Sequence, residues 1–274
     1  MVEILKKEKE DFGELEKKIR KDVDKSGFIA VFEITNGHNG YGNSNLIYKK
    51  QQLDYNEHFI TKKLKINKKN LYNVVLFVAT KQETVEGFCK LFNPKNEKSV
   101  LFVNEYDSNL LYNTIKNINE DQTLDAYRKG FFSFLYSSIG KNNFNDIVKY
   151  FNKNNFKELE RLITEYEEKD GLDKHNNKAL ESYPGKIGFI RGSLAENYAY
   201  EIFDFAFKEK KINDYQMFRR VKSEIMLCKR ERNCSLFKEQ TKIEIDLIII
   251  SKKKSFREVL NYLLEKGFVY NRYN

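Results

Sequence analysis

The sequence predicts an α/β protein, with an N-terminal parallel-sheet α/β region that carries a helical extension, followed by a smaller α+β module. Three observations predict this class. Short apolar runs alternate with segments of helical periodicity up to residue 118, a pattern typical of parallel sheets. Residues 124–168 then show helical periodicity alone. The last part of the chain combines a helix, an isoleucine-rich hairpin and a second helix.

A polar segment separates these two regions. Residues 169–184 are rich in Lys, Asp, Asn and Gly and end near a Tyr-Pro pair, which is the composition of a connecting loop. We therefore predict one domain at 1–168, with the helical extension at its end, and a second domain at 186–274.

Composition indicates a folded, cytoplasmic protein. Charged residues make up 32% of the 274 residues and mean hydropathy is −0.67, yet aromatic residues reach 14%, which disordered chains lack. No apolar run approaches the roughly 18 residues of a membrane span, and the N-terminus lacks a secretory pattern, so we expect no membrane partner. The odd cysteine count suits a reducing compartment. Neither the cysteines nor the scattered histidines have metal-ligand spacing: Cys89, Cys228, Cys234, His38, His58 and His175.

In the N-terminal region, continuous apolar runs predict buried strands, and a capping box at Thr80–Glu83 predicts the start of a helix. The expected elements are a helix at 3–24, a strand at 28–34, a strand at 71–79, a helix from 80 to about 92, a strand at 100–103 and a helix ending at 118.

The glycine-rich segment Gly37–Ser44 has the spacing of a phosphate-binding P-loop, with Asn43 in place of the usual lysine. Its backbone N–H groups suit an anion, but the cation that reaches the terminal phosphates is missing. We favour a turn that joins two strands, the second of which starts at residues 46–48. A degenerate nucleotide-binding loop is the alternative.

The segment Val100–Asp107 resembles the Walker B strand of AAA-like ATPases, with Asn104 in place of the aspartate. The same region is also similar to the nucleotide-sensing, Rossmann-like domain that precedes nucleases in CRISPR ancillary proteins. Buried strands followed by capped helices would produce the same pattern without either function.

In the C-terminal region, an amphipathic helix begins at Gly192 and runs to about Phe207. A hairpin follows, with strands at 222–230 and 243–250. Because side chains alternate along a strand, we expect two faces on the second strand. One face is wholly apolar and consists of Ile243, Ile245, Leu247 and Ile249. The other face carries two carboxylates and consists of Glu244, Asp246, Ile248 and Ile250. A helix at 255–266 and an edge strand at 268–273 complete the region.

Carboxylates beside buried aliphatic residues need cations or hydrogen-bond donors, so Glu244 and Asp246 are candidate ligands for a hard metal such as Mg²⁺. Each candidate acid also has a structural interpretation. Glu196 closes a capping box with Ser193 at the start of the helix. Glu244 and Asp246 are placed to pair with the neighbouring lysines Lys222, Lys229 or Lys242.

Residues 188–250 resemble the PD-(D/E)xK nuclease superfamily, in which a helix opening Gly-x-x-x-Glu precedes a hairpin strand reading apolar-Glu-Ile-Asp-apolar. The resemblance implies a restriction-endonuclease-like fold, with Glu196 as the helix carboxylate, Asp246 as the central ligand, Glu244 beside it, and Mg²⁺ or Mn²⁺ as cofactor. The Glu-x-Lys strand of the pattern is not found. Lys252 and Lys253 are the candidates to replace its lysine.

Positive charge is concentrated around this candidate site. Residues 208–254 contain 14 Lys or Arg against 7 Asp or Glu, a net charge of +7, whereas the whole chain has a net charge of +9. Such a surface favours DNA or RNA, because each phosphate contact releases counterions. The candidate nucleic-acid contacts are Arg219, Arg220, Lys222, Lys229, Arg230 and Lys254.

Together, these patterns predict a nucleic-acid-directed, metal-dependent phosphodiesterase, endonuclease-like and acting in genome defence, as a homo-oligomer or with a defence-complex partner. Two alternatives remain open at the sequence level. One is a catalytically inactive nuclease-like scaffold that binds nucleic acid or a protein. The other is the degenerate P-loop protein.

Overall fold

The computed structural model describes residues 2–36, 43–80, 82–91, 100–118, 125–138, 144–152, 156–170, 182–228 and 238–271. Side chains are described throughout these ranges except at 2–12, 43–50, 91, 138, 170, 223–228 and 238–243.

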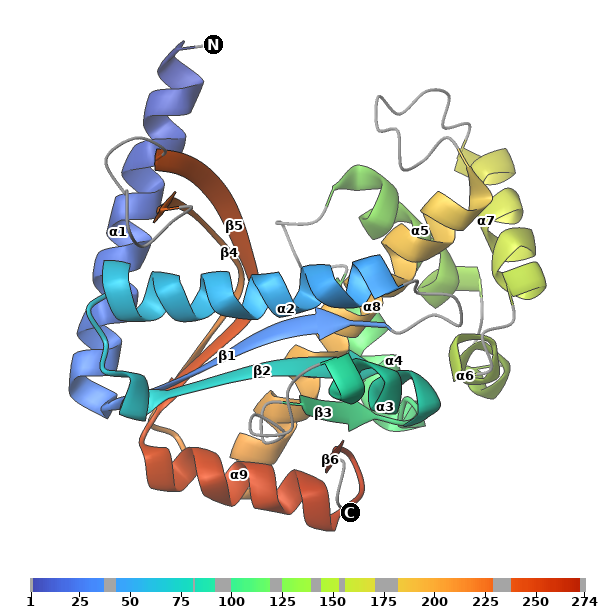
Figure 1. The fold of residues 1–274 in the computed structure, drawn as a ribbon. Helices are drawn as coiled ribbons and strands as arrows, with labels where there is room; N and C mark the ends of the chain where they lie inside the picture. The colour runs from blue at the N-terminus through green and yellow to red at the C-terminus, as the bar shows by residue number, and fades with distance from the viewer. Residues whose placement is uncertain are drawn as a thin grey trace.

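One mixed sheet lies at the centre of the described chain, with the strand order β4-β5-β1-β2-β3-β6 (Figure 1). β1, β2 and β3 are parallel, whereas β5 pairs antiparallel with β1, β4 with β5, and β6 with β3. The strands are β1 (Phe28–Thr35), β2 (Leu71–Val78), β3 (Val100–Val103), β4 (Tyr215–Cys228), β5 (Lys238–Ser251) and β6 (Tyr270–Asn271). The α/β class is confirmed. Strands from both predicted regions share the sheet because β5 pairs with β1.

Helices cover both faces of this sheet. On one face lie α1 (Val2–Ser26), α2 (Asn43–His58), the π-helix η1 (Phe59–Lys63), the short η2 (Lys68–Asn70) and α3 (Gln82–Leu91). The other face carries α4 (Ser108–Ile118), α8 (Tyr183–Glu209) and α9 (Lys253–Glu265). α5 (Ala126–Ser138), α6 (Phe144–Asn152) and α7 (Phe156–Asp170) pack on α4 and α8, farther from the sheet (Figure 1). Alternate side chains of β1 enter different cores, Ile29 and Val31 under α1 and η1, Ala30 and Phe32 under α8 and α9. Except for the strand at 46–48, the predicted strands correspond to strands of the sheet, and the helix at 3–24, the helical segment 124–168 and the helix at 255–266 are confirmed within these bounds.

The prediction of a second strand at residues 46–48 is wrong, because Asn43–His58 is the helix α2. Its buried side chains, Gln52, Leu53 and Asn56, recur at helical spacing against the sheet. The three apolar residues were too short a run to distinguish a strand from a helix. The glycine-rich residues 37–42 lie outside the described ranges.

The helix α8 begins at Tyr183, well before the predicted start at Gly192. Its N-cap is Ser182, whose hydroxyl oxygen accepts a hydrogen bond from the Gly185 backbone N–H at 3.3 Å. Pro184 sits in the first turn, where a missing N–H carries no penalty. The capping box predicted at Ser193–Glu196 is therefore wrong, because both residues lie inside the helix.

Candidate nucleic-acid interface

The β4–β5 hairpin extends beyond the part of the sheet in which β5 pairs with β1. β5 pairs with β1 from Ser251 opposite Phe28 to Leu247 opposite Phe32, and no further. β4 and β5 continue to pair with each other as far as Cys228 opposite Lys238. We call the part beyond the last rung shared with β1, residues 220–228 and 238–246, the arm. In Figure 1 the arm rises away from β1 beside α1.

Asp246 lies where β5 leaves β1. Its Oδ2 accepts a hydrogen bond from the backbone N–H of Ile34 at 2.6 Å. A strand partner would normally supply that acceptor, and an unpaired buried N–H is unfavourable. The half-buried Asp246 carboxylate therefore replaces a ladder bond at the point where the two strands diverge.

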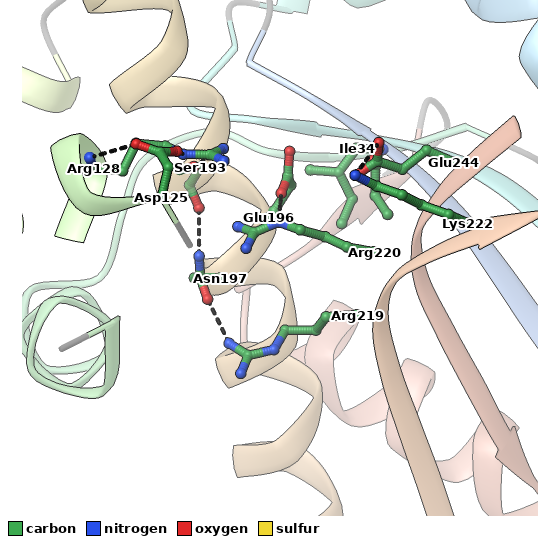
Figure 2. A network of polar contacts seen from close by, with 11 residues as sticks. Ile34, Asp125, Arg128, Ser193, Glu196, Asn197, Arg219, Arg220, Lys222 and Glu244 are labelled. Atoms are coloured by element: carbon green, nitrogen blue, oxygen red, sulfur yellow. Dashed lines mark hydrogen bonds and ion pairs between the residues drawn. The ribbon is translucent and has the colours of Figure 1, made fainter. Parts of the chain in front are cut away.

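Arg220 marks the same position on β4. The β4–β5 register passes from Arg219 opposite Leu247 to Val221 opposite Ile245, with no paired rung for Arg220 and Asp246. Arg220 has φ +50°, in the left-handed region that a long side chain rarely adopts. As a result, two consecutive side chains turn toward α8 (Figure 2). Arg219 Nη1 donates to Asn197 Oδ1 at 2.5 Å, and Arg220 Nε donates to Glu196 Oε2 at 2.7 Å.

The irregular rung also changes the faces predicted for β5. Ile245 joins the core under α1 together with Ile248 and Ile250, whereas Leu247 and Ile249 join the core under α8. The prediction that Ile245 and Leu247 share one face is therefore wrong. Strict alternation assumes a regular ladder, and the ladder is interrupted between these two residues.

The three predicted metal ligands have different environments. Glu196 forms an ion pair with Arg220, whose side chain is 9% exposed. Glu244 lies opposite Lys222 on the arm, 3.6 Å from its Nζ, in an exposed pair. Asp246 bonds to the Ile34 N–H. The lysine-pairing interpretation of Glu244 is thus confirmed for Lys222.

A chain of polar contacts runs across α8 beside this site (Figure 2). Arg128 on α5 is ion-paired with Asp125 and donates from Nη1 to Ser193 Oγ at 2.7 Å. Asn197 Nδ2 donates to the Ser193 carbonyl oxygen at 2.8 Å, and its Oδ1 receives Arg219. The contacts of Arg128 with Ser193 and of Arg219 with Asn197 could not be predicted from the sequence, because their partners lie far apart along the chain. They orient Arg219, which also lies over Tyr200 with 4.7 Å between guanidinium carbon and ring centre.

The two lysines proposed to replace the missing motif lysine lie at the other end of β5. Lys252 forms an ion pair with Asp214 at 2.8 Å, and Lys253 Nζ donates to the Lys69 carbonyl oxygen at 3.2 Å. Lys252 follows Asp246 by six residues, which is about 20 Å along a strand. The structure therefore does not bring these lysines to the acids.

Two of the remaining predicted nucleic-acid contacts lie near opposite ends of β5. Lys222 is exposed on the arm, and Lys254 is exposed on α9, beyond the opposite end of β5. Lys229 and Arg230 lie outside the described residues.

A second set of cations was not predicted from the sequence. α1 packs against β4 and β5, and its solvent-facing side exposes the cationic residues Lys17, Lys18, Arg20 and Lys21. Lys18 Nζ lies 5.4 Å from the centre of the Phe218 ring on β4. The signal was present in the charge pattern of residues 3–24, but only packing placed that helix beside the arm.

The described residues contain no cluster of three or more His, Cys, Asp or Glu side chains arranged to hold a metal ion. Glu196 and Glu244 each face a cation, and Asp246 bonds to a backbone N–H, so the three carboxylates do not offer Mg²⁺ a shared set of oxygen ligands. Mg²⁺ binding by these carboxylates therefore remains a prediction, and the arrangement of their side chains does not favour it.

Comparison with protein-family models, with curated proteins and with solved structures found no match to this chain. Within the described ranges, no helix combines the length and the hydropathy needed to cross a bilayer.

Proposed function

We propose that this chain binds nucleic acid through the arm and the adjoining solvent-facing side of α1, on a nuclease-like scaffold whose acidic residues have structural partners. One observation carries the proposal. The acids expected to hold a catalytic metal are paired within the protein, while exposed cations gather on α1 and the arm beside them.

The cations on α1 and the arm suit a phosphate backbone better than a protein carboxylate. Lys17, Lys18 and Lys21 are exposed and can each approach a phosphate with release of counterions. The Lys222–Glu244 pair has side chains 59% and 47% exposed, and such pairs contribute little in water. Lys222 can therefore exchange Glu244 for a phosphate at small energetic cost.

A second candidate is the metal-dependent phosphodiesterase predicted from the sequence. The irregular rung at Arg220 and Asp246 supports it, because interrupted ladders and left-handed non-glycine residues gather at active sites. In that case Asp246 would hold a divalent ion after rearrangement of the side chains around it, and the ion would neutralise charge at the phosphorus.

Binding is tested with fluorescein-labelled single- and double-stranded DNA and RNA oligonucleotides, followed by anisotropy across a salt series. The triple variant Lys18→Glu, Lys21→Glu, Lys222→Glu is expected to bind at least about tenfold more weakly and to lower the magnitude of the salt slope by about three. The matched control is Lys90→Glu, an exposed lysine on α3 away from the arm. Equal affinities for the wild type and the triple variant would reject the proposed surface.

The second candidate is tested with the same oligonucleotides and either Mg²⁺ or Mn²⁺. Cleavage that Asp246→Asn abolishes would select the phosphodiesterase. Binding without cleavage would select the scaffold. Asp246→Asn is a suitable probe because its amide oxygen can still accept from the Ile34 N–H, so the strand junction is preserved.

A further inference from the structure

Arg220 combines a strained backbone with a largely buried charge. A left-handed conformation costs a residue with a side chain about 1–2 kcal/mol, and Arg220 adopts it with φ +50°. Its side chain is 9% exposed, so the guanidinium has lost most of its hydration. Both costs have to be offset by contacts that only this orientation allows.

One of these contacts is on α8, where Glu196 accepts a hydrogen bond from Arg220 Nε at 2.7 Å. In the hairpin, Asp246 occupies the position opposite Arg220, bracketed by the paired rungs Arg219–Leu247 and Val221–Ile245. Arg220 therefore extends from the irregular rung beside Asp246 to the Glu196 carboxylate.

Glu196 and Asp246 are two of the three residues that the sequence predicts as ligands of a divalent ion. We infer that the Arg220 guanidinium is a built-in cation that takes the place of that ion and holds α8 against the arm. Arg220 is thus a positioning residue. The inference rests on the proposed function and deepens it, since it explains how a nuclease-like scaffold presents the arm without a metal.

The positive charge of the Arg220 guanidinium supports this assignment. A guanidinium beside Glu196 repels a divalent ion that would approach the same carboxylate, and it supplies hydrogen bonds that an ion lacks. Removal of the guanidinium leaves Glu196 without its counter-charge. A half-buried carboxylate without a counter-charge favours a hard, oxygen-seeking cation.

The test is metal-dependent stability, measured without nucleic acid. Wild-type protein is expected to unfold at the same temperature in EDTA, in Mg²⁺ and in Mn²⁺. Arg220→Gly keeps the positive φ without strain and removes the charge. In this variant, a saturating concentration of Mn²⁺ is expected to raise the melting temperature by about 5 °C over EDTA. Calorimetric titration with Mn²⁺ should show binding to the variant and none to the wild type.

Two controls isolate the effect. Arg219→Ala removes the neighbouring arginine, whose partner is the neutral Asn197, so no response to Mn²⁺ is expected. The double variant Arg220→Gly, Glu196→Gln should lose the response gained by the single variant. Where Arg220→Gly is too unstable to purify, Arg220→Asn serves in its place, because asparagine also tolerates the left-handed region.

The inference fails if folded Arg220→Gly and Arg220→Asn show no response to Mn²⁺. It also fails if the wild type is itself stabilised by Mn²⁺ through Asp246. Neither result depends on nucleic-acid binding, so failure here is distinguishable from failure of the proposed surface on α1 and the arm.

Discussion

The two halves of β5 have opposite character, although they belong to one strand. Leu247, Ile248, Ile249 and Ile250 are each 0% exposed, lie between β4 and β1, and are covered by helices on both faces. Beyond Leu247 the strand leaves β1, and its next residues toward the hairpin tip include Asp246 and the exposed Glu244. β5 is therefore apolar on both faces only where the sheet continues on both sides of it.

The same boundary separates two kinds of contact. On the shared side, aromatic rings pack without polar partners, as in the pair Phe32–Phe203 with ring centres 4.8 Å apart. On the arm side, Asp246 satisfies a backbone N–H, and Arg220 satisfies Glu196. Apolar burial therefore holds the sheet, and directional polar contacts hold the junction between the arm and α8.

The largest predicted difference is between a ring at the centre of the sheet, on β1, and a ring at its edge, on β4. Phe32 is 0% exposed and contacts both Phe203 and Phe256, so Phe32→Ala should lower the free energy of unfolding by about 3–5 kcal/mol. Phe218 is only partly buried beside Lys18, and Phe218→Ala should have a clearly smaller effect. Urea denaturation measures both. Equal losses would mean that the edge strand β4 is packed as tightly as the centre of the sheet.

The contact between α5 and α7, which pack on α8, allows a separate test of close apolar packing. A Cβ at Gly130 would lie 2.2 Å from the Tyr166 hydroxyl oxygen. That ring is held by Phe131 and Tyr127 and cannot move away freely. Gly130→Ala should therefore destabilise by about 1–3 kcal/mol. Gly192→Ala, in α8 with nothing within 4 Å, should be neutral or stabilise by up to about 1 kcal/mol. Thermal unfolding in parallel distinguishes them.

On the junction side, Glu196→Gln should destabilise by about 2 kcal/mol, because it leaves the largely buried Arg220 without its counter-charge. The control is Glu201→Gln on the same helix. Burial raises the pKa of Glu201, and Asn117 donates to its Oε1 at 2.9 Å, an acceptor that glutamine retains.

The raised pKa of Glu201 determines how its contribution to stability depends on pH. Because its folded pKa exceeds its unfolded pKa, its favourable contribution is present at low pH and lost as pH rises through the folded pKa. Glu201→Gln should therefore be neutral or slightly stabilising at pH 7. Chemical denaturation at pH 5 and 7 measures this. A loss at pH 7 equal to that of Glu196→Gln would contradict the distinction between the two acids.

The smallest effect is expected at the far end of β5, where Lys252 holds the pKa of Asp214 below its usual value of 3.8. Because the folded pKa is lowered, the stabilisation is present at neutral pH and lost as pH falls through the folded pKa. Lys252→Ala should lower the melting temperature slightly at pH 7, and its difference from wild type should shrink below about pH 4. A difference that is constant with pH would exclude the ion pair as its cause.

Much of the fold was predictable because its signals are local. The apolar runs of β1, β2 and β3 and the periodicity of α1 and α9 each lie within a single segment. The start of α8 was missed because Pro184 has the same composition signal in a loop and in the first turn of a helix. The strand predicted at residues 46–48 was wrong because three apolar residues are too short a run to distinguish a strand from the helix α2.

The candidate site was predictable only as a set of residue types. The carboxylates and the basic excess could be identified from the sequence. The partners of Glu196 and Asp246 could not be identified, because Arg220 and Ile34 are brought to them by the sheet. The cations of α1 were visible in the sequence, yet nothing local indicated that this helix packs on β4 and β5.

By itself, the sequence determined the α/β class, the order of most helices and strands, and the concentration of positive charge, because these depend on short-range periodicity and on composition. Only the tertiary structure decided that β5 pairs with β1 and departs after Leu247, and that Arg220 turns left-handed toward α8. Strand pairing and ion pairing join residues distant in the chain, and their geometry is set by which surfaces must be buried together.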